Sequence, residues 1–213
     1  MKTIATKLLV LVLALACMLP LFVACDDQAT DPVETTTPAP EVSAPATGEV
    51  AGLTAPIAEA PALVTSGGQS ADYQMIATVM GKVGMDYTVS NLCTSADLGD
   101  AKTLIVVVGG SSKGLGAAGI DADGELARLT ELLDGAKAAG LTVIAMHTGG
   151  EARRGELSDK FITPIFEKAD YAIVVTSGDE DGLMSGICAS KGIPMDGIKS
   201  ISEVATVLPA AFK

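Results

Sequence analysis

The stretch Thr103-Leu104-Ile105-Val106-Val107-Val108 decides the fold class of this chain. It is a continuous apolar run without polar alternation, and Ala172-Ile173-Val174-Val175 shows the same pattern later in the chain. Strands of this kind are covered on both faces, which is typical of parallel sheets that lie between two layers of helices. The two runs therefore predict an α/β fold.

Further strands and helices alternate around these two runs. We expect strands at 62–65, 87–90, 103–108, 141–147 and 171–176, and helices around the apolar stripes at 75–83, 126–136, 158–168, 180–191 and 200–212. The alternation predicts a five-stranded, doubly wound parallel sheet. This is a flavodoxin-like or Rossmann-like three-layer sandwich, for which we expect the strand order 2-1-3-4-5.

Residues 1–24 have the features of a lipoprotein signal peptide. Lys2 and Lys7 give a positive start before the apolar run 8–15, and Leu21-Phe22-Val23-Ala24-Cys25 forms a small-residue cleavage site that ends in cysteine. Cys25 is therefore the expected lipidation site, and the lipid bilayer is an expected partner. Two acyl chains on one cysteine suffice for stable anchoring. We expect a protein of the bacterial cell envelope, held on the outer face of the cytoplasmic membrane.

Residues 25–59 differ sharply in composition from the rest of the chain. After the cysteine they contain five prolines, seven acidic residues and no Lys or Arg, and they show no apolar period. Such a segment cannot bury enough surface to offset its ordering entropy. We interpret it as a disordered tether with a reach of roughly 30 to 35 Å. A processed pro-segment is the alternative, and residues 60–213 are expected to form a single α/β domain.

The charge balance excludes some partners. Without its first 24 residues the chain has 12 basic and 26 acidic residues, a formal charge of −14, and it contains no Trp. An acidic chain without a basic stripe is unsuited to nucleic acid, and anionic lipid repels it. Cys93 and Cys188 remain for the domain, where a disulfide is one option and two buried thiols are the favoured one.

Three glycine-rich loops follow the first, third and fourth expected strands, at 66–72, 109–116 and 147–155. Because these strands are neighbours in the expected order, we expect the loops to share one crevice at the carboxyl edge of the sheet. Lys113, Arg153 and Arg154 bring positive charge there, which suits a carboxylate or phosphate. The candidate ligand-binding residues are Ser66, Gly68, Gln69, Ser70, Gly110, Ser111, Ser112, Lys113, Gly114, His147, Gly149, Gly150, Arg153 and Arg154. Alternatively, the glycines serve only tight turns and the arginines are solvated.

The sequence matches known catalytic motifs only in part. The segment Gly110-Ser111-Ser112-Lys113-Gly114 satisfies G-x-S-x-G, but that motif needs a helix immediately afterwards, and 115–119 is a poor helix start. Ser112 and His147, the only histidine, are retained as catalytic candidates. The glycines also resemble those of short-chain dehydrogenases, whose Tyr-x-x-x-Lys pair is absent, and no Walker A tripeptide occurs. We expect no cofactor and no metal site.

Several longer motifs carry a family resemblance. They lie at 61–66, 68–72, 109–119, 147–155 and 157–161, and at Ser177-Gly178 and Asp181-Gly182. Over roughly residues 60–212 the chain resembles the bacterial lipoprotein and secreted family called domain of unknown function 6305. The resemblance implies an extracytoplasmic α/β domain. It supplies no reaction, so it assigns no catalytic residue.

Three classes of function remain. The leading hypothesis is a tethered module that binds a small anionic molecule and hands it to a transporter or sensor. The second is an extracytoplasmic hydrolase or transferase that uses Ser112 or His147, and the third is a protein-interaction module. The residues favour binding over catalysis without deciding between them.

Overall fold

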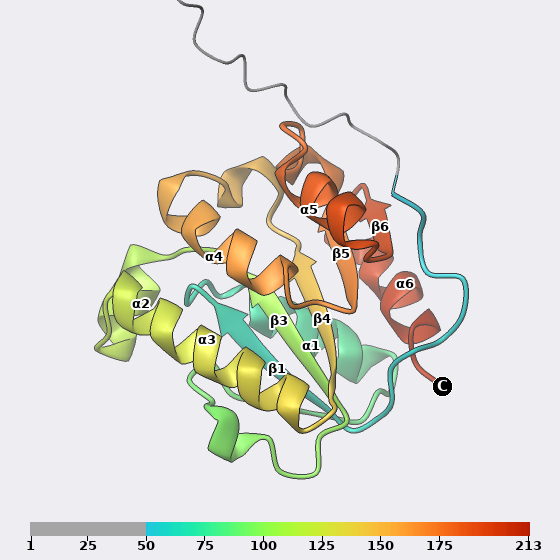
Figure 1. Cartoon of the computed structure of the whole chain (residues 1–213), viewed down its shortest axis with the longest axis horizontal. Helices are drawn as coiled ribbons and strands as arrows, with labels where there is room; N and C mark the ends of the chain where they lie inside the picture. Colours follow the sequence, from blue (N-terminus) through green and yellow to red (C-terminus); the bar gives the residue numbers. More distant parts are fainter. Residues whose placement is uncertain (1–49) are drawn as a thin grey trace, which may run out of the picture. The chain divides into compact units, whose positions relative to one another are not determined.

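The computed structural model describes residues 50–213, which form one parallel sheet with helices on both faces (Figure 1). Six strands lie in the order β2-β1-β3-β4-β5-β6. Their bounds are Ala62–Gly67 for β1, Tyr87–Val89 for β2, Thr103–Val108 for β3, Thr142–His147 for β4, Tyr171–Val175 for β5 and Met195–Ile198 for β6. Every pair of neighbouring strands runs parallel, so the predicted α/β class with a parallel sheet is confirmed.

The helices fill the connections between the strands. The α-helices are α1 (Asp72–Lys82), α2 (Ser112–Ala118), α3 (Ala122–Ala138), α4 (Glu156–Phe166), α5 (Leu183–Lys191) and α6 (Val204–Ala210). Short 3₁₀ helices are η1 (Ser95–Asp97), η2 (Gly150–Arg153), η3 (Thr176–Gly178) and η4 (Ile201–Glu203). Because each strand runs parallel to its neighbour, the loops at the strand ends gather at one edge of the sheet, the carboxyl edge.

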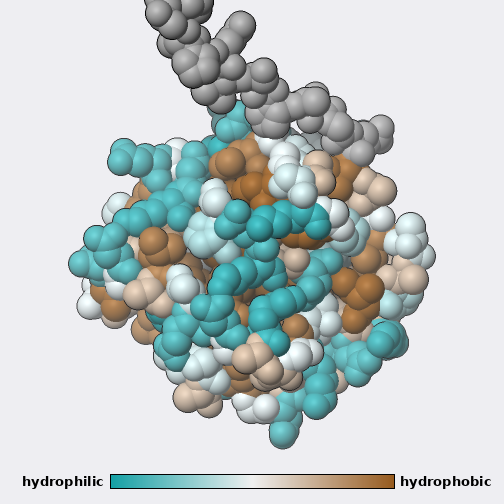
Figure 2. Space-filling view, viewed as in Figure 1, coloured by the Kyte–Doolittle hydropathy of each residue, from teal (hydrophilic) through white to brown (hydrophobic). Residues whose placement is uncertain are grey.

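The two faces of the sheet carry separate hydrophobic clusters. Side chains alternate along a strand, so Leu104 and Val106 of β3 pack with α3, α4 and α5, whereas Ile105 and Val107 pack with α1 and α6. In Figure 1 α3, α4 and α5 lie in front of the sheet and α1 lies behind it. These four side chains are fully buried, and each contributes roughly 1.5–3 kcal/mol to stability. The outer surface of the front face is mostly hydrophilic (Figure 2).

The expected number of strands was wrong, because β6 adds a sixth strand beside β5. Its sequence is Met-Asp-Gly-Ile, and only Ile198 at its end is buried. Such an edge strand lacks the apolar run by which a covered strand is found in a sequence. The first five strands lie in the order 2-1-3-4-5.

The expectation that no helix follows the G-x-S-x-G segment immediately, because 115–119 is a poor helix start, was also wrong. α2 starts at Ser112, and the Oγ of Ser111 accepts a hydrogen bond from the backbone N–H of Gly114 at 3.0 Å. The helix ends at Gly119, which has the left-handed φ of 71° that glycine tolerates. A good cap at each end therefore outweighs the low helix propensity of two internal glycines.

Cys93 and Cys188 are both buried and both unpaired. They lie in the cluster on the front face, so the favoured interpretation of two apolar thiols is confirmed. Burial raises the pKa of the Cys188 thiol to about 12, which keeps it protonated.

The part of the expected tether that the structure describes, 50–59, lies along the domain. We call it the strap. Near its start the carbonyl oxygen of Ala51 accepts a hydrogen bond from the N–H of Met195 in β6, at 3.1 Å. Near its end the fully buried Ala58 donates to the carbonyl oxygen of Ala211, at 2.8 Å. The strap thus extends the packed unit beyond the boundary expected at residue 60.

Residues 1–49 lie outside the described residues, and they include the expected signal peptide, Cys25 and most of the tether. Within 50–213 no helix has both the length and the apolar character needed to cross a membrane.

Candidate functional site

Three loops at the carboxyl edge form the rim, where the sequence placed a ligand. They are the first rim loop (68–71, after β1), the second (109–111, after β3) and the third (148–155, after β4). In the observed strand order β1 is followed by β2 on one side and β3 is followed by β4 on the other. The point between β1 and β3, where the order switches, is where ligands of open α/β sheets usually bind. The structure brings all three loops together, as expected.

The first and second rim loops are hydrogen-bonded to each other. The N–H of Ser70 donates to the carbonyl oxygen of Gly109 at 3.1 Å, and the N–H of Ser111 donates to that of Gly68 at 2.9 Å. Gln69 and Gly110 also form an isolated antiparallel bridge. The expectation of an open crevice shared by these two loops is therefore corrected, because the protein's own backbone fills it.

The rim glycines allow contacts within the protein. A Cβ on Gly114 would overlap the carbonyl oxygen of Gln69, and one on Gly110 would lie 2.8 Å from the backbone of Leu157. A Cβ on Gly68, whose φ is +106°, would lie 2.8 Å from the carbonyl oxygen of Gly109. Real Cβ atoms do not approach so closely. The alternative left open by the sequence, that these glycines serve the loops themselves, accounts for all three positions.

A buried ion pair supports the first rim loop. The fully buried Glu125 carboxylate accepts bonds from Arg128 Nε at 2.8 Å, from the Gly68 N–H at 2.9 Å and from Gln69 Nε2 at 3.1 Å. Arg128 also donates to the carbonyl oxygen of Ser66, at 2.8 Å. Gln69 is the only non-glycine residue within 50–213 that has a positive φ, 62°. The ion pair thus holds the loop in a conformation that L-residues seldom adopt.

Sequence reasoning missed Glu125 and Arg128, although a signal was present. The apolar stripe of α3 includes Leu129 and Leu133, and one helical step before Leu129 the same stripe carries Glu125. A charged side chain on a core-facing stripe needs a buried partner, and Arg128 three residues later provides one.

Arg153 and Asp72 form a partly exposed charged pair at the rim. Arg153 Nε donates to Asp72 Oδ2 at 3.0 Å, and Nε is the only guanidinium nitrogen of Arg153 with a hydrogen bond inside 50–213. The Arg153 side chain is 38% exposed and that of Asp72 is 9% exposed. Arg153 also lies across Gly149, where a Cβ would overlap its Cγ. Asp72 begins α1, where the helix dipole favours a negative charge.

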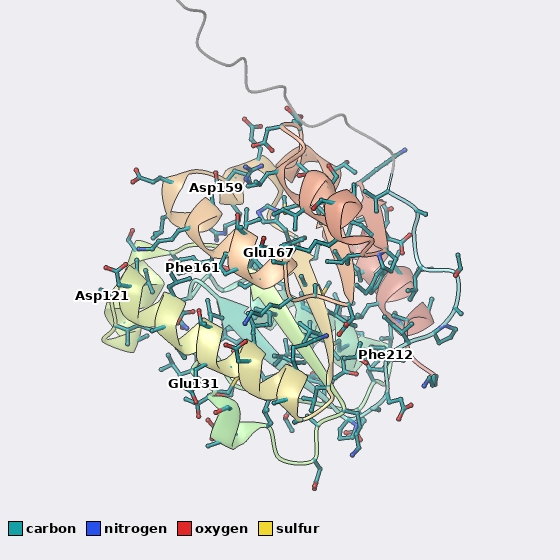
Figure 3. The ribbon with its side chains drawn as sticks, viewed as in Figure 1. Asp121, Glu131, Asp159, Phe161, Glu167 and Phe212 are labelled. Carbon is teal, nitrogen blue, oxygen red and sulfur yellow. The ribbon has the colours of Figure 1, made fainter. Side chains whose placement is uncertain are left out.

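Arg154 has a different environment from its neighbour. Its guanidinium donates to Asp159 at 2.8 Å, to Asp181 at 2.7 Å and to the carbonyl oxygen of Gly178 at 2.6 Å. Figure 3 labels Asp159, which lies on α4 near Phe161. The Arg154 guanidinium beside Asp181 lowers the pKa of that carboxyl to about 2. The positive charge expected from Arg154 is therefore neutralised within the fold, and the residue joins the third rim loop to α4 and to the start of α5.

His147 lies beneath the third rim loop and is fully buried. Its Nε2 lies 3.1 Å from the carbonyl oxygen of Arg153, so Nε2 carries the hydrogen and donates it. Burial lowers the pKa of the imidazole, which is consequently neutral at neutral pH. His147 holds the backbone of Arg153, and its Nδ1 lacks a hydrogen-bond partner in the described part of the chain.

The remaining candidate ligand-binding residues fall into a buried group and an exposed group. Ser66 and Ser70 are fully buried, and the Oγ of Ser66 donates to the carbonyl oxygen of Ser70 at 3.2 Å. Ser112 and Lys113 are exposed on the first turn of α2, and their side chains make no hydrogen bond within the described residues. Gly150, with a φ of 59°, packs beside Ser177. No group of three or more metal-ligating side chains occurs between residues 50 and 213.

Comparisons with known proteins give little beyond the family. No curated protein matches this chain. One similar solved structure is the psychrotrophic esterase EstA from Pseudoalteromonas sp., inhibited by monoethylphosphonate, with 13% identity over 64% of this chain and 76% of that chain, at a TM-score of 0.29. The structure of TesA matches with 14% identity over 63% of this chain and 77% of that chain, also at a TM-score of 0.29. Likenesses this distant carry no argument about function.

The family match covers the whole α/β domain. A family model described as Domain of unknown function matches residues 59–212, which includes the end of the strap, all six strands and the rim. This confirms the resemblance carried by the motifs in the loops and helices. The chain belongs to the family Domain of unknown function (DUF6305).

Proposed function

We propose that this chain is a membrane-tethered extracytoplasmic lipoprotein whose α/β domain binds a small anionic ligand, a carboxylate or a phosphate, at the carboxyl edge of its sheet. The flavodoxin-like, doubly wound architecture is part of the proposal, because it gathers the three rim loops beside one another. The tether and its lipid at Cys25 would keep the domain near the outer face of the cytoplasmic membrane. There it would hand its ligand to a transporter or sensor.

Arg153 is the observation that carries the proposal. Only its Nε is bonded, to Asp72, and its two terminal nitrogens have no hydrogen-bond partner within 50–213. The edge formed by these two nitrogens matches the two oxygens of a carboxylate or phosphate in a bidentate contact. Asp72 is stabilised both by the start of α1 and by Nε, so it orients the guanidinium.

Lys113 and Ser112 are the other rim groups that suit an anion. Both are exposed on the first turn of α2, next to the second rim loop. An ammonium adds attraction to a negative ligand, and a hydroxyl donates a hydrogen bond to it. Arg154 is left out of the ligand contacts, because two carboxylates already neutralise it. Its role in the proposal is to fix the third rim loop, which carries Arg153.

The test is a thermal-shift and calorimetric titration of the full chain in detergent with succinate, citrate, glutamate and inorganic phosphate. A ligand at 100 times its dissociation constant adds roughly 2.7 kcal/mol of stability. We expect a shift with at least one probe that disappears in Arg153→Gln/Lys113→Gln. The matched control is Lys82→Gln/Lys102→Gln, which removes two charges at the opposite edge of the sheet. The absence of any shift, or an equal shift in both double variants, would contradict the proposal.

An extracytoplasmic hydrolase or transferase is the second candidate, and α2 favours it. The helix begins at Ser112 directly after a strand and a short turn, as a G-x-S-x-G nucleophile requires. Against it, His147 is buried and its Nε2 is bonded to the Arg153 carbonyl, so it does not serve Ser112 as a base in this arrangement. A serine-directed fluorophosphonate that labels the wild-type chain but not Ser112→Ala would favour the hydrolase or transferase over the binding module.

A further inference from the structure

A pocket at the rim differs in chemistry from the proposed anion site at Arg153. It has a volume of about 320 Å³ and lies between α1, the loop after β2 and α2. Its polar lining includes Gln69, Tyr73, Gln74 and Asn91, and its apolar lining includes Leu92 and Ala117. No residue that lines it is charged, and Arg153, Lys113 and Ser112 are not among its lining residues.

The side chain of Gln69 is fixed at the wall of this pocket. Its Nε2 donates to Glu125 and to the carbonyl oxygen of Asn91, the latter at 2.8 Å. Its Oε1 accepts from Asn91 Nδ2 at 2.9 Å, so the two carboxamide side chains hold each other. Because Glu125 is itself bound by Arg128, the orientation of the carboxamides is set by a buried ion pair. A site whose polar groups are fixed in advance loses little entropy on binding.

The groups that remain unused in the pocket include both donors and acceptors. Within 50–213 no hydrogen bond is made by Asn91 Oδ1 or by the Oε1 of Gln74. Tyr73 accepts from Gln74 Nε2 at 3.0 Å, which leaves the hydroxyl hydrogen of Tyr73 for another acceptor. An anion can satisfy only the donors, and a cation only the acceptors. A hydroxyl group satisfies both at once.

The apolar part of the pocket suits the carbon skeleton of a polyhydroxylated ligand. Leu92 is 39% exposed, and Ala117 on α2 is exposed and lines the same pocket. A sugar ring presents C–H groups on its faces and hydroxyl groups around its edge, so it needs a lining of this mixed kind. The aromatic ring of Tyr73 adds an apolar surface with a polar end.

We propose that this pocket binds a neutral sugar. Gln74, Asn91 and Tyr73 contact its hydroxyl groups, and Leu92 and Ala117 contact its C–H faces. The proposal goes beyond the anion site and does not depend on Arg153.

The test uses the full chain in a detergent without a sugar headgroup, titrated calorimetrically with glucose, galactose, N-acetylglucosamine and maltose. We expect at least one of the four to bind. Ala117→Leu, which fills the pocket, and Gln74→Ala, which removes an exposed polar group, should each weaken binding at least tenfold. The matched control is Ala127→Leu, at an exposed position of α3 outside the pocket, and it should bind like the wild type.

Two results would overturn this inference. One is that none of the four sugars binds the wild-type chain. The other is that either Ala117→Leu or Gln74→Ala binds as tightly as the wild type. The Arg153→Gln/Lys113→Gln variant should keep its sugar binding, so failure of the anion site and failure of the sugar site are distinguishable.

Discussion

Arg153 and Arg154 are adjacent in the chain, yet their guanidinium groups have different surroundings. Arg153 is 38% exposed and bound through one nitrogen, whereas Arg154 is 15% exposed and bound to two carboxylates and a carbonyl oxygen. Successive residues of an extended or 3₁₀ segment point in different directions, so one side chain faces outward and the next crosses to α4 and α5. We therefore expect substitution of Arg153 to affect ligand binding and substitution of Arg154 to affect the stability of the fold.

Replacement of Arg154 by Met should lower the free energy of unfolding at pH 7 by about 1–2 kcal/mol, measured by urea titration. The loss is limited because Asp181 is 58% exposed and water screens its charge. The matched control is Lys137→Met, which breaks an exposed pair with Asp170 and should cost less than about 0.5 kcal/mol. An equal loss in both variants would contradict a structural role for Arg154.

The ion pair between Arg154 and Asp181 also predicts that the free energy of unfolding depends on pH. The pKa of Asp181 is about 2 in the folded chain, below its ordinary value, so its contribution is complete above about pH 4. The contribution is lost as the pH falls through 2, because the unfolded chain binds the proton first. The stability difference between the wild type and Arg154→Met should therefore shrink between pH 4 and pH 2. A difference that stays constant over this range would show that the carboxylates are not involved.

The sequence identified the charged residues of the rim without identifying their partners. Asp181 lies 27 residues from Arg154, and the contact depends on how the loop after β5 folds over the third rim loop. A periodic pattern of apolar residues gives no information about a contact of this kind. Glu125 differs in this respect: sequence reasoning missed it, although its position on the apolar stripe of α3 could have marked it as a buried residue.

At the scale of elements, the continuous apolar runs predicted the buried strands correctly, whereas the sequence analysis did not recognise the caps that allow α2 to form. β3 and β5, with continuous runs, are buried along their whole length, as expected. β6 has no such run because it is an edge strand, and its start bonds to the strap as well as to β5. α2 was missed because its stability depends on Ser111 and Gly119, which sit outside the helix and add nothing to its propensity.

The contribution of the cap to the stability of α2 can be tested by removing one atom, the Oγ of Ser111. Ser111→Ala removes the acceptor for the Gly114 N–H and should cost about 1 kcal/mol in the free energy of unfolding. Ser112→Ala, one residue later, is the matched control and should change stability by less than about 0.5 kcal/mol, because Ser112 is exposed. Chemical denaturation of both variants measures the difference. A larger cost at Ser112 than at Ser111 would mean that the cap is not what starts the helix.

Over the whole domain, the strap and the rim lie at opposite edges of the sheet. The strap contacts the starts of strands, since the N–H of Glu59 donates to Thr103 Oγ1 at 3.1 Å and Thr142 Oγ1 donates to the carbonyl oxygen of Ile57 at 3.3 Å. The rim lies where the strands end. Residue 50, from which the preceding chain continues, is therefore attached at the amino edge, next to β6. This arrangement leaves both proposed binding sites on the edge away from the attachment point.

The lipid anchor is the prediction on which the location of the whole protein depends. In a bacterial host grown with an alkyne analogue of palmitate, the wild-type chain should incorporate the label, and its mass should correspond to a polypeptide that starts at Cys25. Cys25→Ser should lose the label, because a hydroxyl at that position is not expected to accept the lipid. The matched control is Cys17→Ser, which leaves with the signal peptide and should label fully.

The charge of the chain means that membrane attachment, as proposed, would rest on the lipid alone. Without the predicted signal the chain has a formal charge of −14, which anionic lipid would repel. In the proposed arrangement only the acyl chains, at about 0.8 kcal/mol for each buried CH₂, would hold it at the membrane. Equal labelling of Cys25→Ser and Cys17→Ser would place any lipid elsewhere. Absence of label from the wild type would remove the tether from the proposed function, while leaving the two binding sites of the rim to be tested on their own.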